Sequence, residues 1–211
     1  MVYRRTAAAS ERDARTRTTI LVAARDVVRE SGLTGAAIAA VAARAGVAVG
    51  TVYRHFPSRD ELITEVVRET CDRELAEVAA VVRSDGPPAD RLVAAVELFA
   101  TRALASGRLA YSMIAEPTTE AAEVLRLVIR AELAKLFASI VADGVATGAF
   151  ERQDPATSGT ALVGAVSEVL IGPLARQPLS GDERSEVLEH LTQFAMRAVG
   201  VRSPATLEVA R

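Results

Sequence analysis

The sequence has very little sulfur and few aromatic side chains. It contains one cysteine, Cys71, and no tryptophan, and aromatic residues make up 4% of its 211 positions. A single cysteine cannot form an internal disulfide, and no cysteine or histidine group has the spacing of a metal site. The two histidines, His55 and His190, lie far apart in the chain. We therefore expect no metal, no cofactor and no thiol–imidazole catalysis.

Long apolar runs are also absent. The longest candidate, residues 159–175, is interrupted by Ser167, Glu168 and Pro173, so we predict no membrane span. The N-terminus lacks the apolar stretch of a secretory signal. The spacing of Gly46–Gly50 lacks the Gly-Lys-Ser/Thr of a phosphate-binding loop. These absences favour a cytoplasmic protein that is not an enzyme, although scattered carboxylates leave an enzyme as an alternative.

Helical spacing of apolar residues dominates the sequence. Half of the residues are apolar, and no strand-like alternation stands out. We predict an all-α protein of about nine helices, with a capping box of Ser58 and Glu61 at the start of the fourth. Outside a central short-helix motif, the predicted helices cover residues 13–31, 58–82, 89–104, 107–115, 120–147, 156–174 and 182–199.

That motif is residues 41–62, VAARAGVAVGTVYRHFPSRDEL, which have the pattern of two short helices joined by a tight turn. Val41, Ala42 and Ala45 repeat at helical spacing, and Gly46 follows them. Glycine adopts the left-handed backbone at a helix C-terminus without a Cβ clash, so we predict that the first helix ends there. The arrangement predicts a helix-turn-helix, whose second helix enters the major groove of DNA.

The second helix of the motif is expected to begin near Ala48 or Val49. It should stop before Pro57, because the residue preceding a proline is pushed out of the helical region. Val52 and Phe56 fall on one side, which we expect to be buried. The other side carries hydrogen-bond donors, an aromatic ring and cations: Thr51, Tyr53, Arg54 and His55. An ordinary surface helix is the alternative interpretation.

Charge is divided unevenly along the chain. The net charge is −2, but residues 1–60 contain ten arginines against five acidic residues, a net charge of +5. Residues 61–211 carry a net charge of −7. A basic N-terminal unit attracts the phosphate backbone of DNA, and the acidic remainder would be repelled by it. A charge bias without function is the alternative.

The segment AGVAVGTVYRHFPSRDEL closely resembles the DNA-binding signature of the TetR family of bacterial transcriptional repressors, commonly AGVSxGTxYxHFxxKxxL. The resemblance covers about residues 15–65. It implies that Thr51, Tyr53 and His55 contact the DNA backbone or base edges. It also implies that Arg59, where lysine is usual, contacts phosphate. Positions that vary among family members, and often set the operator sequence, are Val49, Gly50 and Arg54.

The sequence departs from the family signature in two places. Ala48 stands where many members have a serine, so a side-chain N-cap is missing, which typically costs about 1 kcal/mol. The preceding helix opens with Ala37, Ala39 and Ala40 instead of polar residues. We therefore expect DNA reading to depend more heavily on the second helix of the motif and on N-terminal arginines.

The resemblance further implies that the last two helices form a four-helix dimer interface. Small residues between Gly159 and Ser167 would allow close helix approach, either across a dimer or within one chain. The middle helices would then form a chamber for a small-molecule effector, unless these residues are ordinary core. The candidate chamber residues are Phe99, Arg102, Tyr111, Met113, Ile114, Arg130, Phe137 and Glu168.

We therefore predict a dimeric, ligand-responsive repressor that binds a palindromic DNA operator. A DNA-binding regulator without an effector is the second interpretation. The predicted organisation is a mobile basic arm (1–12), a helix-turn-helix domain (13–60), a helical effector-binding and dimerisation domain (61–200) and a frayed tail (201–211).

Overall fold

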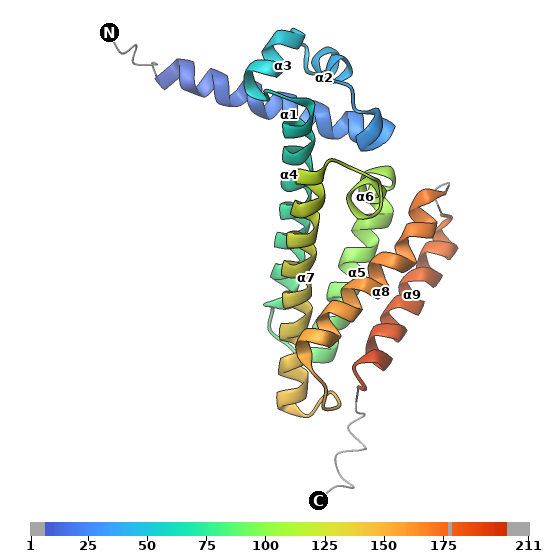
Figure 1. Ribbon diagram of the computed structural model, residues 1–211. Coiled ribbons are helices and arrows are strands. Elements are labelled where there is room, and N and C mark those ends of the chain that lie inside the picture. Colours follow the sequence, from blue (N-terminus) through green and yellow to red (C-terminus); the bar gives the residue numbers. More distant parts are fainter. Residues whose placement is uncertain (1–6, 177–178, 202–211) are drawn as a thin grey trace, which may run out of the picture.

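The computed structural model describes residues 7–176 and 179–201, which form nine α-helices and no strand (Figure 1). The all-α prediction is confirmed. A single isolated bridge joins Phe150 to Val201. The helices are α1 (Ala7–Gly35), α2 (Ile38–Ala45), α3 (Val49–His55), α4 (Arg59–Val82), α5 (Pro88–Ser106), α6 (Arg108–Ile114), α7 (Glu120–Thr147), α8 (Pro155–Ala175) and α9 (Gly181–Ala198).

The first helix is longer than the sequence predicted. Residues 1–6 of the predicted mobile arm lie outside the described residues, but residues 7–12 form the opening turns of α1. Alanine has the highest helix propensity of any residue type. The run Ala7-Ala8-Ala9 therefore extends the helix toward the N-terminus, ahead of the predicted start at Asp13. At the other end, the backbone leaves the helical region at Gly32, with φ of 76°. The predicted tail, apart from Val201, lies outside the described residues.

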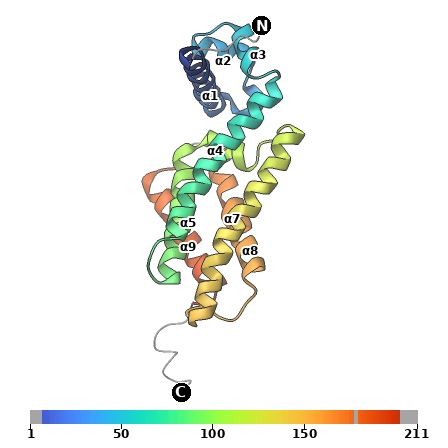
Figure 2. The ribbon, with the colours of Figure 1, turned by 90° about the vertical axis from the view of Figure 1, so that its left-hand side faces the viewer.

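Helices α1 to α3 and the start of α4 form a head, with the other helices gathered in a body below it (Figures 1 and 2). The core of the head includes the fully buried Val28, Val41 and Val52 together with Leu62 of α4. The predicted boundary at residue 60 stays a prediction, and the head core extends past it. A second core fills the body.

Helix α4 connects head and body. Its first half contributes Ile63 and Val67 to the head core, and its second half contributes Val78 and Val82 to the body core. Figure 2 shows the helix descending from the head alongside α5 and α7. Ser58 caps its start by accepting a hydrogen bond from the Glu61 N–H at 3.0 Å. One continuous helix therefore contributes to both cores.

Helices α7 and α8 pack closely where Gly159 faces α7. A Cβ at Gly159 would lie 2.5 Å from the carbonyl oxygen of Ala134 and 2.6 Å from the Ala138 nitrogen. Only a glycine permits this approach of two backbones. By length and composition α8 could also cross a membrane, but core helices of soluble proteins meet the same criterion. Leu162, Val166 and other residues of α8 are buried in the body core.

Candidate nucleic-acid interface and ligand cavity

The turn of the helix-turn-helix is formed as the sequence predicted. Gly46 adopts the left-handed conformation, with φ of 64° and ψ of 33°. Ala48 precedes α3 without any side-chain cap, and α3 ends at His55 with Phe56 extended before Pro57. Val52 and Phe56 are buried against the head, so the opposite side of α3 faces outward.

The outward side of α3 carries most of the predicted DNA contacts. Val49, Gly50, Tyr53 and Arg54 are exposed, and Thr51 is partly exposed. Tyr53 is 46% exposed although it is aromatic, so its ring and hydroxyl are available to a partner. The pattern is a polar, cationic surface on a helix whose apolar side is fixed to a core, as a major-groove reading helix requires.

His55 does not share this surface. Its side chain is 6% exposed, and its Nε2 lies 3.7 Å from Oδ1 of Asp13 in α1. His55 is the last residue of α3, where the helix turns back toward α1, and the guanidinium of Arg17 lies 4.9 Å above the neighbouring Phe56 ring. His55 therefore contacts α1 in this structure, and its predicted contact with DNA stays a prediction.

Arg59 is half-buried and binds the end of α1 in the head. Its Nε donates to the carbonyl of Ala36 at 3.0 Å, and its Nη2 donates to the carbonyls of Leu33 at 2.5 Å and Thr34 at 3.1 Å. These carbonyls follow the break at Gly32, where the regular hydrogen bonding of α1 ends. The guanidinium therefore binds the end of α1, and the predicted phosphate contact of Arg59 stays a prediction.

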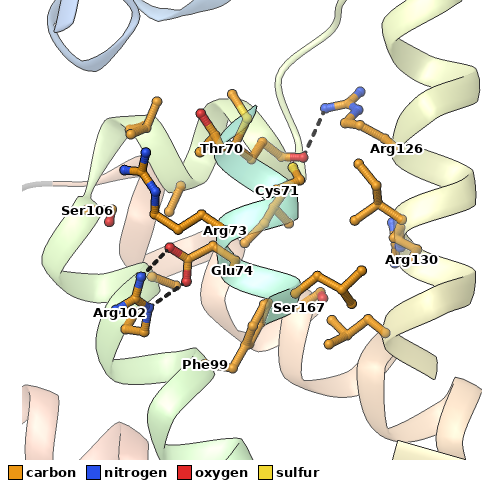
Figure 3. Close-up of a pocket in the computed structure, with 18 of the residues that line it drawn as sticks. Thr70, Cys71, Arg73, Glu74, Phe99, Arg102, Ser106, Arg126, Arg130 and Ser167 are labelled. Atoms are coloured by element: carbon orange, nitrogen blue, oxygen red, sulfur yellow. Dashed lines mark hydrogen bonds and ion pairs between the residues drawn. The ribbon is translucent and has the colours of Figure 1, made fainter. Parts of the chain in front are cut away.

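The body contains a cavity of about 280 Å³ between α1, α4, α5, α6, α7 and α8 (Figure 3). Its wall is mainly apolar, with Leu75, Phe99, Leu133 and Val163 among the lining residues. Polar lining groups come from Thr70, Ser106, Ser167 and several arginines. The volume is just below the range of about 300–1,000 Å³ for ligand pockets, and an apolar wall with a few polar groups is their usual composition.

An ion pair crosses one side of the cavity. Arg102 of α5 donates through Nε and Nη2 to the two carboxylate oxygens of Glu74 in α4, at 2.7 and 2.8 Å (Figure 3). Cys71 lines the same cavity, and burial, with Asp72 nearby, raises the pKa of its thiol to about 12. The thiol therefore stays protonated at neutral pH and acts as a small apolar group, not as a nucleophile.

Five of the eight predicted chamber residues line this cavity: Phe99, Arg102, Met113, Ile114 and Arg130. The other three do not line this cavity. Phe137 is buried in the body core, and Tyr111 lines a separate hollow between α6 and the end of α8. Glu168 is exposed. Consecutive side chains on a helix point about 100° apart, so Glu168 and the residue before it face different surroundings. Its neighbour Ser167 lines the cavity instead.

Glu116, which follows α6, connects the body to the head. Its carboxylate accepts hydrogen bonds from the Leu33 N–H at 2.9 Å, the Thr34 hydroxyl at 2.5 Å and the Ser112 hydroxyl at 2.5 Å. Burial alone would raise the pKa of Glu116, but these bonds and one from the Thr34 N–H lower it to about 2. Arg126, which lines the cavity, donates to the Glu116 carbonyl at 2.9 Å. The cavity wall and the end of α1 are thus joined through two residues.

Comparison with family models covers both parts of the molecule. Residues 20–66 match the model described as bacterial regulatory proteins, tetR family, and residues 92–187 match the model described as tetracyclin repressor-like, C-terminal domain. The chain belongs to the TetR family. The head is thus the TetR helix-turn-helix unit, and the body matches the domain that follows it in this family.

Individual TetR proteins resemble the chain over different lengths. The HTH-type transcriptional regulator UidR of Escherichia coli strain K12 is 38% identical over 61 residues, which cover 29% of this chain and 31% of UidR. The crystal structure of FadR from Bacillus subtilis with stearoyl-CoA has a TM-score of 0.70 at 16% identity, covering 83% of this chain and 97% of FadR. RolR with resorcinol has a TM-score of 0.62 at 20% identity, covering 95% of each chain. The structural likenesses show the TetR fold.

Sequence reasoning missed part of the TetR cavity wall. Arg25 and Arg29 of α1 belong to the head by sequence, yet both line the cavity in the body. On α4, the missed residues are Thr70, Cys71, Arg73, Glu74 and Leu75. No local pattern marks these positions, because they come together only when α1 and α4 cross.

Proposed function

We propose that this TetR-family chain is a dimeric repressor that binds a palindromic DNA operator and is released by a small molecule. The observation that carries the proposal is the outward, cationic side of α3 on a head that shares α4 with a cavity-containing body. Because its target would be bacterial DNA, the proposal includes a cytoplasmic location. FadR and RolR, which share its fold, have been determined with bound stearoyl-CoA and resorcinol, which supports a ligand role for the cavity.

The dimer would form through α8 and α9. Val169 of α8 and Phe194 of α9 are large apolar residues left exposed in the single chain, and Phe194 is 44% exposed. A Cβ added at Gly164 or Gly172 would meet nothing within 4 Å, so another helix can approach the backbone of α8 closely there. A two-fold dimer would set two α3 helices about 34 Å apart, or a multiple of it, to match successive major grooves.

Ligand release would act through α4 and Glu116. A molecule in the cavity contacts α4, and it also contacts Arg126, whose Nη1 holds the carbonyl of Glu116. A displacement of α4 or of Glu116 would change the angle between head and body. The two α3 helices would then no longer match the spacing of successive major grooves. A coupling free energy of about 1–3 kcal/mol suffices to change operator affinity 5- to 150-fold.

The test begins with selection of DNA from a random pool, followed by gel-shift titration. Tyr53→Ala and Arg54→Ala should each weaken binding to the selected site about tenfold or more. Arg152→Ala, which removes an exposed arginine of the body, is the matched control and should leave affinity unchanged. The affinity for DNA should also fall steeply between about 50 and 200 mM salt. Protein binding releases counterions from the DNA, and this release is less favourable when the salt concentration is high.

Equal affinity for all three variants would overturn the assignment of α3 as the reading helix. A selected site without two-fold symmetry would overturn the dimeric repressor. A regulator without an effector is separated from the proposal by a thermal-shift screen of small molecules, in which no compound would then stabilise the protein.

A further inference from the structure

Acidic side chains neutralise only some of the arginines that line the cavity. The six lining arginines are Arg25, Arg29, Arg73, Arg102, Arg126 and Arg130. Four of them have an acidic partner within 4.0 Å. These pairs are Arg29–Asp26, Arg73–Glu69, Arg102–Glu74 and Arg126–Glu123. The remaining two, Arg25 and Arg130, form no ion pair with any residue that the structure describes. The cavity wall therefore carries more positive charge than its own carboxylates balance.

Arg25 is the more informative of the two. Its Nη1 is buried and has no hydrogen-bond partner among the described residues. A buried charged N–H without an acceptor is unfavourable, so a group that accepts a hydrogen bond would complete the site, and a negatively charged one would also balance the guanidinium. Arg130 is exposed, and solvent satisfies it without such a group.

The position of Arg25 orients such a group. Arg25 lies on α1, so it belongs to the head, and it lines the cavity together with Thr70 and Cys71 of α4. Figure 3 shows Thr70 and Cys71 at the same end of the cavity as Arg126, and Phe99 and Ser167 at the other end. Phe99 lies at that second end, and Leu133 and Val163 are further apolar residues of the wall. One end of the cavity therefore suits an anion, and the other suits an apolar body.

We propose that the cavity binds an apolar molecule bearing one anionic oxygen group, a carboxylate or a phosphate, with that group bonded to Arg25. The apolar part lies toward Phe99 and Val163. This inference rests on the proposed function, because it names the chemical class of the effector for the same cavity. The ligand then joins α1 of the head directly to the body, in addition to the route through α4.

The test compares ligands that differ only in their charged group. Decanoate, decyl phosphate, decan-1-ol and decylamine are titrated into the full chain by isothermal calorimetry, alongside the 4-phenylbutyl series with the same four groups. At least one of the anions should bind about tenfold or more tightly than its alcohol and its amine, as expected for a charge-assisted hydrogen bond. Comparison of carboxylate with phosphate identifies the anionic group.

The variant Arg25→Gln should abolish the preference for the anion over the alcohol, and Arg25→Lys should retain part of it. Arg15→Gln is the matched control, because Arg15 is an exposed arginine of α1 that does not line the cavity, and it should behave as wild type. Arg25 has no ion pair to break, so the substitution tests ligand contact instead of folding.

Three results would overturn the inference: an alcohol or amine that binds as tightly as the anions, an unchanged preference in Arg25→Gln, or no anion binding at millimolar concentration in either series. DNA binding is measured on the same preparations. Operator binding without anion binding overturns the ligand class alone, whereas loss of operator binding in the wild-type protein overturns the proposed function.

Discussion

Glu116 and Thr34 form a double hydrogen bond between the body and the head. The carboxylate accepts from the Thr34 hydroxyl at 2.5 Å and from the Thr34 N–H at 3.1 Å, although 82 residues separate the two in the sequence. Glu116 is 5% exposed, so water does not compete for these bonds. The contact connects the end of α1 to the residue that follows α6.

The substitution Glu116→Gln should lower the free energy of unfolding by about 1–3 kcal/mol. An amide turns one acceptor oxygen into a donor that faces N–H and O–H groups, which leaves them unsatisfied. The measurement is urea denaturation at pH 7 and fixed protein concentration. Glu186→Gln changes an exposed glutamate and is the control. Equal midpoints for both variants would show that the Glu116 bonds contribute nothing net.

The same carboxylate predicts a pH dependence of stability. The pKa of Glu116 is lowered to about 2 in the folded protein, below the value of about 4.3 for an unfolded glutamate. Its contribution is therefore complete above about pH 5 and is lost as the pH falls toward 2. Wild type should lose more stability than Glu116→Gln between pH 5 and 3. Parallel pH profiles of the two proteins would contradict this assignment.

Arg59 provides a separate test of the head. Arg59→Ala should lower the unfolding free energy by about 1.5–3 kcal/mol, since three hydrogen bonds from a charged group to backbone carbonyls are lost. Arg54→Ala, on the outward side of α3, should leave stability unchanged and weaken DNA binding. Thermal unfolding and gel shift on both variants measure the two effects. An Arg59→Ala protein of normal stability and weak DNA affinity would favour phosphate contact as its main role.

The proposed dimer predicts that one exposed apolar residue matters and another does not. Phe194→Glu should shift the protein from dimer to monomer in sedimentation equilibrium, because a buried carboxylate at a two-fold interface lies near its own copy. Leu127→Glu, on an exposed side of α7, is the control, and Leu127 is even more exposed than Phe194. If both variants remain dimeric, the interface lies elsewhere.

Helix positions were predictable wherever an end signal stands beside an apolar pattern. Thr119 accepts from the Ala122 N–H at one end of α7, and the left-handed Gly148 closes the other, which reproduces the predicted range 120–147. The start of α1 has no cap residue, and its prediction was six residues late. The capping box of Ser180 and Glu183 was overlooked, although its sequence signature is present.

Site residues were predictable only where a helix surface alone determines exposure. Tyr53 and Arg54 face outward because Val52 and Phe56 must face inward. His55 could not be placed this way, since its neighbour is α1 and the crossing of α1 and α3 is tertiary. Arg59 was assigned by family resemblance, and the broken end of α1 at Gly32 that it satisfies cannot be seen from its own segment.

Cys71 allows a dye to be attached inside the body cavity. It is the chain's only sulfhydryl, and it borders the cavity. Any thiol-directed dye must therefore attach at that wall and nowhere else. Because the thiolate is scarce at neutral pH, labelling is slow. The labelling rate then measures how often the cavity is open to the dye and free of ligand.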